Sequence, residues 1–216
     1  MNAKLEKALK RLKCILPLQE RQAECSRQIR ELHQHVLRSF VTQGRILTRE
    51  EMARLISNLE DAINVLRESE LMVFSEEGMP VGAYPFTIEV REHKVRINSR
   101  QVYAMCALDA LAISPMFGMH AHIVSRCRIT GDPVNIQQSG RIIENPNEAG
   151  DVHLGIAWGA EETDACCANS LCMEMMYLRD SNIARQWLEA DLENRESFTL
   201  PEAVEFASEF FIPLTR

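Results

Sequence analysis

The sequence predicts an α+β protein, in which a helical N-terminal region with a winged-helix-like module packs on a mixed β-sheet core with helices. Two patterns predict this class. In the first third of the chain, apolar residues recur every three or four positions, as in amphipathic helices. From Phe86 onward, short stretches alternate between apolar and polar residues, as in half-buried strands. We therefore expect two domains, with residues 1–85 forming the helical region and residues 86–216 the core.

The first two helices are predicted from the spacing of their apolar residues. Leucines between residues 5 and 16 step by four, three and four positions, and Pro17 ends this helix because proline cannot continue one. The apolar positions of residues 29–40 repeat the same spacing. Each segment therefore forms a helix with one buried face.

Two capping boxes and a hairpin predict the winged-helix-like module. Residues 48–51 read Thr-Arg-Glu-Glu and residues 57–60 read Ser-Asn-Leu-Glu. Each pattern is typical of a helix start, so we expect short helices reaching about residues 56 and 67. Two apolar stretches, 71–74 and 81–84, follow on either side of a glycine turn. Two short helices followed by a hairpin give the outline of a winged helix.

The core is expected to begin with a hairpin and a buried helix. Residues 87–90 and 95–97 alternate and are separated by a polar turn, which predicts two paired strands. Asn98 or Ser99 is a suitable cap for a helix that runs through residues 103–113. This segment is apolar on almost every face, so the helix should be buried all round.

The rest of the core is predicted from alternating stretches and one proline. Pro201 is suited to the first turn of the closing helix. The remaining elements that we expect are strands at residues 122–125, 134–136, 152–157 and 171–177, and helices at about 183–190 and 201–211.

Composition and charge exclude several classes of protein. Hydrophobic residues make up 46% of the 216 residues and charged residues 25%, which is ordinary for a globular protein. The chain has neither a run of about 18 apolar residues nor a secretory signal, so we expect a cytoplasmic protein with no membrane partner. Residues 1–50 carry a net charge of +6 and residues 51–216 a net charge of −13.

The basic N-terminal charge is not expected to serve nucleic-acid binding. Its lysines and arginines alternate with leucines at helical spacing, so they form a solvated helix face. The second helix of the winged-helix-like module begins with Glu60 and Asp61, which DNA phosphates would repel. We therefore expect no nucleic-acid partner, and a thiol-based winged-helix regulator remains an alternative.

Cysteine usage points to chemistry at Cys106. The seven cysteines are an odd number in a chain without a secretory signal, which indicates reduced thiols. Asp109 is an ionisable residue inside the apolar helix, three positions after Cys106. Residues at this spacing lie on one helix face, so a thiol and a carboxyl share one apolar pocket. A structural reading also stands, in which Asp109 accepts backbone hydrogen bonds and Cys106 fills the core.

Three motifs in order resemble the alkylmercury (organomercurial) lyase family. Residues 103–109 read Tyr-Ala-Met-Cys-Ala-Leu-Asp, where the family has Tyr-Ala-Trp-Cys-Ala-Leu-Asp. A Ser-x-Cys strand at residues 125–127 and a Thr-Gly-x-Pro-Val turn at 130–134 follow. The resemblance extends from about Gly44 to about Phe211. The departure is Met105, which stands where the family has tryptophan and bears on substrate preference.

The resemblance implies an activity and a set of roles. Such enzymes cleave the carbon–mercury bond by protonolysis and give a hydrocarbon and Hg(II). It implies that Cys106 is one of two thiolates that bind mercury, that Asp109 carries the proton, and that Cys127 is a structural cysteine. The expected substrate is an organomercurial, no organic cofactor is implied, and Hg(II) is bound as product. Small thiols or a mercury reductase are the expected acceptors of that product.

The second thiolate is assigned to Cys172. The family has a cysteine doublet opening a strand, with a tryptophan on a helix about fifteen residues later. Trp187 follows Cys172 by fifteen residues, and Met173 then replaces the second cysteine of the doublet. Cys166 and Cys167 are the competing doublet. In our assignment they are loop thiols that either pass mercury in or out or have no role.

A second class of function remains open from the sequence. A non-catalytic protein on the same fold could hold a soft ion such as Hg(II) or Cu(I) with the same thiols. Met105 and the methionines at residues 173–176 favour it, because thioethers also bind Cu(I). Asp109 favours the enzyme, since a soft-metal site has no need of an acid.

Overall fold

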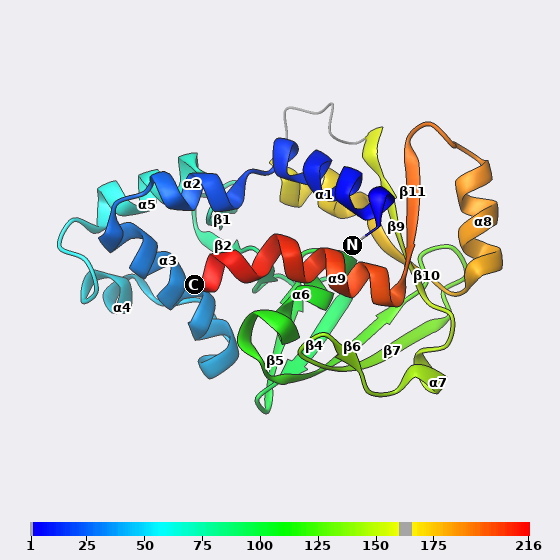
Figure 1. Ribbon diagram of the computed structural model, residues 1–216. Coiled ribbons are helices and arrows are strands. Elements are labelled where there is room, and N and C mark those ends of the chain that lie inside the picture. Colours follow the sequence, from blue (N-terminus) through cyan, green and yellow to red (C-terminus); the bar gives the residue numbers. More distant parts are fainter. Residues whose placement is uncertain (1, 160–165) are drawn as a thin grey trace.

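The computed structural model describes residues 2–159 and 166–216, which form two β-sheets surrounded by helices (Figure 1). The helices are α1 (Ala3–Ile15), α2 (Leu18–Glu24), α3 (Arg27–Gln43), α4 (Arg49–Ala53), α5 (Leu59–Glu68), α6 (Ala107–Phe117), α7 (Pro146–Ala149), α8 (Ser181–Glu189) and α9 (Leu200–Phe211). The strands are β1 (Val73–Phe74), β2 (Pro80–Ala83), β3 (Phe86–Thr87), β4 (His93–Ile97), β5 (Arg100–Ala104), β6 (His120–Arg126), β7 (Pro133–Ser139), β8 (Ile142–Ile143), β9 (His153–Ala157), β10 (Met175–Leu178) and β11 (Arg195–Thr199). Short 3₁₀ helices are η2 (Cys167–Asn169), η3 (Leu171–Glu174) and η4 (Ile212–Thr215). None of the described helices is long and apolar enough to cross a membrane.

The α+β class is confirmed, but the sheets are antiparallel rather than mixed. The larger sheet has the strand order β1-β2-β3-β5-β4-β6-β7-β8, and the smaller has the order β10-β9-β11. Every ladder between the described strands is antiparallel. Short turns join several neighbouring strands, and a short turn permits only antiparallel pairing. A single parallel bridge between Cys127 and Tyr177 links the two sheets.

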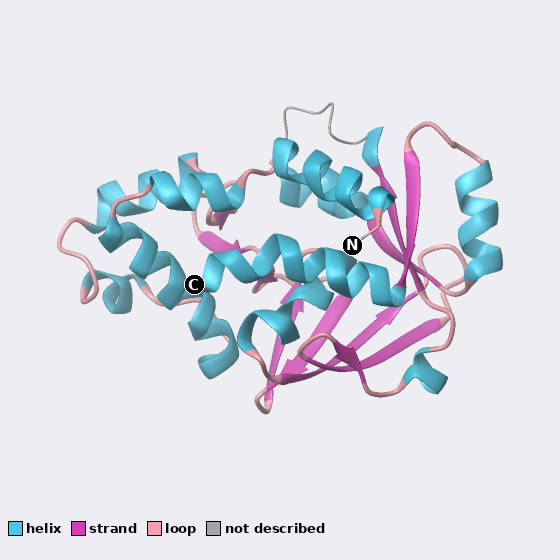
Figure 2. Cartoon of the chain, viewed as in Figure 1, coloured by secondary structure: helices cyan, strands magenta, loops and turns pink. Residues whose placement is uncertain are grey.

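Helix α6 lies at the centre of the core. It packs against strands β4 to β7 on one side and against α9 on the other. Figures 1 and 2 show α9 crossing above α6, with the large sheet below. This position explains why the α6 segment is apolar on nearly every face, as the sequence predicted. The helix begins at Ala107 rather than at residue 103.

The expected hairpin between residues 87–90 and 95–97 is wrong, because β5 lies between β3 and β4. Asn98 and Ser99, predicted to cap a helix, have φ angles of 47° and 60°. Two successive positive φ values are typical of the tight turn of a hairpin. The chain therefore turns back after β4 and forms β5, whose residues Val102 and Ala104 are buried.

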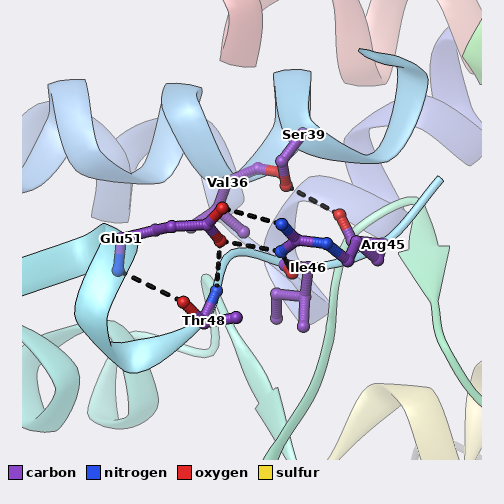
Figure 3. Close-up of polar contacts among 6 residues, drawn as sticks. All are labelled: Val36, Ser39, Arg45, Ile46, Thr48 and Glu51. Carbon is purple, nitrogen blue, oxygen red and sulfur yellow. Dashed lines mark hydrogen bonds and ion pairs between the residues drawn. The ribbon is translucent and has the colours of Figure 1, made fainter. Parts of the chain in front are cut away.

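The four predicted N-terminal helices are present, and α2 is an additional one. The capping box at Thr48 is confirmed: the Thr48 side chain and Glu51 cap each other's backbone amides. Figure 3 shows that Glu51 also forms a double ion pair with Arg45, while Ser39 of α3 donates to the Arg45 carbonyl. The α5 cap differs from the prediction, since the side chain of Asn58 rather than Ser57 accepts the amide hydrogen bond.

The N-terminal region is continuous with the core in its packing. The hairpin of β1 and β2 joins the large sheet, because β2 pairs with β3. Phe40 of α3 stacks on Phe86 of β3, with ring centroids 4.8 Å apart and an interplanar angle of 5°. Both rings are fully buried. The division of the chain at residue 85 stays a prediction, which the stability of a Phe40 variant can test.

We expect Phe40→Ala to destabilise the whole chain by about 3–5 kcal/mol, the usual cost of deleting a buried phenylalanine ring. Both tryptophans, Trp158 and Trp187, lie beyond residue 85, so urea unfolding followed by their fluorescence reports on the core. The exposed Ile142→Ala substitution is the control. An unchanged tryptophan transition in Phe40→Ala would show that the two regions unfold independently.

Candidate active site

The structure brings together the three side chains that the sequence singled out. The Sγ atoms of Cys106 and Cys172 and a carboxylate oxygen of Asp109 all lie within 4.8 Å of one another. All three residues are buried. They come from the first turn of α6 and from the short helix η3, which precedes β10.

The start of α6 positions Cys106 and Asp109. Cys106 is the N-cap residue, with extended backbone, and its sulfur accepts a hydrogen bond from the Asp109 amide at 3.4 Å. The N-terminus of a helix favours negative charge, which suits both a thiolate and a carboxylate. Tyr177 of β10 donates a hydrogen bond to the Ala107 carbonyl at 3.0 Å and fixes this turn against the smaller sheet.

An irregular segment positions Cys172. Residues 171–177 were predicted as one strand, but the strand begins at Met175, and Leu171–Glu174 form the 3₁₀ helix η3. Arg91 holds the preceding turn by donating to the Ala168 carbonyl at 3.0 Å. The tight turn directs Cys172 inward, where its side chain is 3% exposed.

Cys167 is a buried neighbour of the cluster, although the sequence placed it in a loop. Its Sγ atom lies 3.7 Å from Sγ of Cys172, and the residue is 6% exposed. Spacing along the chain gave no signal for this contact, because the two cysteines lie in separate short 3₁₀ helices, η2 and η3. Cys127 is also buried but lies outside the cluster, where its sulfur accepts the Thr130 amide at 3.5 Å. Cys14 is exposed.

Burial controls the protonation of the cluster. It raises the pKa of the Asp109 carboxyl to about 7, although a hydrogen bond with Cys106 opposes the change. Burial also raises the pKa of the Cys106 thiol to about 12. Hydrogen bonds with Cys106 and Cys167, together with burial, raise the pKa of Cys172 well above its ordinary value. Near neutral pH both thiols therefore hold their protons, and Asp109 is close to its midpoint.

The surroundings of the cluster are apolar and soft. The Met175 sulfur lies 3.6 Å from the Cys106 sulfur. Met105 is 3% exposed and packs against Gly82, where an added Cβ would lie 2.6 Å from its terminal methyl carbon. Among the described residues, Oδ2 of Asp109 has no hydrogen-bond partner. The site thus combines two thiols, a residue type that suits a soft cation, with a carboxyl group, a residue type that can transfer a proton.

Comparisons with known proteins agree with this chemistry. The family model for alkylmercury lyases matches residues 86–212. The alkylmercury lyase of Bacillus cereus is 25% identical over 156 residues, which cover 71% of this chain and 69% of the relative. That of Streptomyces lividans is 25% identical over 157 residues, covering 71% and 70%. That of Staphylococcus epidermidis is 27% identical over 146 residues, covering 66% and 63%.

A solved structure shares the fold over almost the whole chain. The mercury-bound form of MerB2 superposes with a TM-score of 0.73 and 18% identity, covering 94% of this chain and 98% of that one. The structural likeness thus includes the N-terminal region, which lies outside the family-model match. Because that match spans more than half of the chain, the protein belongs to the alkylmercury lyase family, whose members are enzymes.

Proposed function

We propose that this enzyme cleaves the carbon–mercury bond of organomercurials by protonolysis at Cys106, Cys172 and Asp109. The observation that carries the proposal is the buried carboxyl of Asp109 within 4.8 Å of two thiols. Thiols alone would suffice to bind a soft cation, whereas an acid in the same apolar pocket supplies what bond cleavage also needs.

Binding requires the thiols to lose their protons. As the Cys106 sulfur bonds to mercury, its proton passes to the Asp109 carboxylate, which is available because its pKa lies near 7. Cys172 then bonds to mercury, and its proton leaves with the displaced thiolate or halide of the substrate. Two thiolates on the R–Hg⁺ cation give a complex of net negative charge, which increases the electron density on carbon.

Cleavage returns the stored proton to the substrate. The Asp109 carboxyl donates its proton to the carbon atom, and the electron pair of the carbon–mercury bond forms the new carbon–hydrogen bond. A hydrocarbon leaves, Asp109 is a carboxylate again, and Hg(II) stays on the two thiolates. The sequence of steps consumes no redox equivalent, so it requires no organic cofactor.

The product must then be removed by a competing soft ligand. Hg(II) binds thiolates strongly, so an external acceptor has to supply further thiols. Small thiols in excess, or a reductase that consumes Hg(II), fit this requirement. We propose one of these as the partner of the enzyme.

Asp109→Asn should abolish hydrocarbon release while mercury remains bound, because asparagine cannot donate the proton. Loss of a general acid lowers rates by about 100-fold or more. Gas chromatography of the headspace over phenylmercury or methylmercury with excess thiol measures benzene or methane, and metal analysis of the isolated protein measures bound mercury. Asp132→Asn, in an exposed turn, is the matched control. Full turnover by Asp109→Asn would show that Asp109 does not carry the proton.

The same pair of measurements separates the enzyme from a soft-metal binding protein. The thioether of Met175 beside Cys106 favours that alternative, because thioethers also bind soft ions. A binding protein would retain mercury in the wild-type chain and in Asp109→Asn alike, and neither would release hydrocarbon.

Cys172→Ser should reduce hydrocarbon release by about 100-fold or more, because a hydroxyl is a poor ligand for mercury and the complex loses its second thiolate. Cys14→Ser, which removes an exposed thiol, should behave as wild type. Retained activity in Cys172→Ser would indicate that Cys167 is the second thiolate instead, because its sulfur lies beside that of Cys172.

Asp109 should also make the metal-free protein less stable as pH rises from about 4 to about 7. Over this range the unfolded carboxyl, with a pKa of 3.8, ionises while the buried one keeps its proton until about pH 7. Since one pKa unit corresponds to about 1.4 kcal/mol, the loss is on the order of 4 kcal/mol. Urea unfolding of wild type and Asp109→Asn at pH 5 and pH 8 measures it. The asparagine variant should gain relative stability at pH 8, and parallel pH profiles would contradict the prediction.

A further inference from the structure

A series of thiols leads from the buried cluster toward the surface. Cys106 and Cys172 share the cluster, and the Cys167 sulfur lies 3.7 Å from that of Cys172. Cys166 immediately precedes Cys167 in the chain and is half-buried. It lines a surface pocket of about 420 Å³. These four cysteines therefore extend from a fully buried cluster to a pocket that an external molecule can reach.

The pocket has a buried polar group without a partner. The residues that line it include Arg67, Glu70, Met72, Phe74, Tyr84 and Cys166. Tyr84 is 1% exposed, and its hydroxyl has no hydrogen-bond partner among the residues that the structure describes. Burial raises the pKa of this hydroxyl well above its ordinary value, and the thiols of Cys172, Cys167 and Cys166 raise it further. A buried hydroxyl without a partner leaves a hydrogen bond that a ligand in this mainly apolar pocket can supply.

The chemistry of Hg(II) gives these thiols a purpose. A soft cation held by two buried thiolates leaves slowly on its own, because a bare ion in an apolar interior is unfavourable. Transfer to an adjacent thiol avoids that state, since a new sulfur bond forms before an old one breaks. Such transfer requires thiols that are close to one another and that end at the surface.

We propose that Cys167 and Cys166 form an exit site for Hg(II), which receives the ion from the Cys106–Cys172 pair and presents it to an external thiol in the pocket beside Tyr84. As a route for product, this site rests on the function proposed above. As a binding site for Hg(II), it can be tested without any organomercurial.

Each transfer is a thiol exchange that balances without oxidation. The Cys167 sulfur bonds to Hg(II), the mercury bond to Cys106 breaks, and the thiol proton of Cys167 passes to the Cys106 thiolate. Hg(II) then lies on Cys172 and Cys167. Cys166 next replaces Cys172 in the same way. Two external thiols, or the two thiols of a dithiol, finally replace the two remaining protein sulfurs, and each gives its proton to the sulfur that it replaces.

The binding test uses a Hg(II) salt under reducing conditions with excess 2-mercaptoethanol, so that only sites with two or more protein thiols keep the ion. In the background of Cys106→Ser, the Cys167 and Cys172 thiols remain, and the protein should retain one equivalent of Hg(II) through gel filtration. Adding Cys167→Ser to this background should abolish the retention of Hg(II), whereas adding Cys14→Ser should leave it unchanged. X-ray absorption should count two protein sulfurs on the retained ion. Equal retention in the Cys167→Ser double variant would overturn the proposal.

The transfer test uses the full chain loaded with one equivalent of Hg(II). Mixing with an excess of an external dithiol should remove the ion about an order of magnitude more slowly from Cys166→Ser than from wild type or Cys14→Ser. Cys166 is half-buried, so its serine variant keeps the fold, and circular dichroism verifies it. Equal rates would exclude Cys166 from the route. Failure of wild type to release hydrocarbon from phenylmercury would refute the lyase function alone, because both tests use Hg(II) itself.

Discussion

The burial of one carboxyl group constrains the rest of this structure. Asp109 is 1% exposed inside a helix that is otherwise apolar, and an ionised carboxylate there would cost several kcal/mol. The fold lowers this cost locally, through the first turn of α6 and the hydrogen bond with Cys106. It does not remove the cost, since Oδ2 of Asp109 lacks a partner among the described residues. The pKa near 7 is the direct consequence.

The packing around α6 maintains that burial. The large sheet covers one side of the helix and α9 covers the other, while Tyr177 ties its first turn to the smaller sheet. Loosening any of these contacts would admit water and return the pKa of Asp109 toward its ordinary value. The proposed reaction would then lose its stored proton at neutral pH. Stability and the proposed chemistry therefore oppose each other at Asp109, as is usual where an ionisable group is kept buried for function.

The sequence predicts those features that depend on local spacing. Cys106 and Asp109 are three residues apart on one helix, so their proximity follows from helical geometry. Cys172 comes from a remote segment of the chain. Its assignment therefore required the family resemblance and the fifteen-residue separation between Cys172 and Trp187. Local patterns failed where one residue type serves two purposes: Asn98 is a good helix cap and also tolerates the positive φ of a tight turn. The tight turn forms because β5 pairs with both β3 and β4, which requires the chain to turn back at Asn98.

The contact between Cys167 and Cys172 could not be predicted from any regular pattern, and regular structure would prevent it. Five residues along a strand span about 16 Å, since each residue advances about 3.3 Å. Along an α-helix, residues five apart point to different faces, because one turn takes 3.6 residues. Two short 3₁₀ helices with a sharp turn between them bring the sulfurs to 3.7 Å instead. The strand predicted at residues 171–177 begins only at Met175, and this late start places a third thiol beside the cluster. The Arg91 hydrogen bonds that hold this turn maintain the spacing on which the proposed transfer between thiols depends.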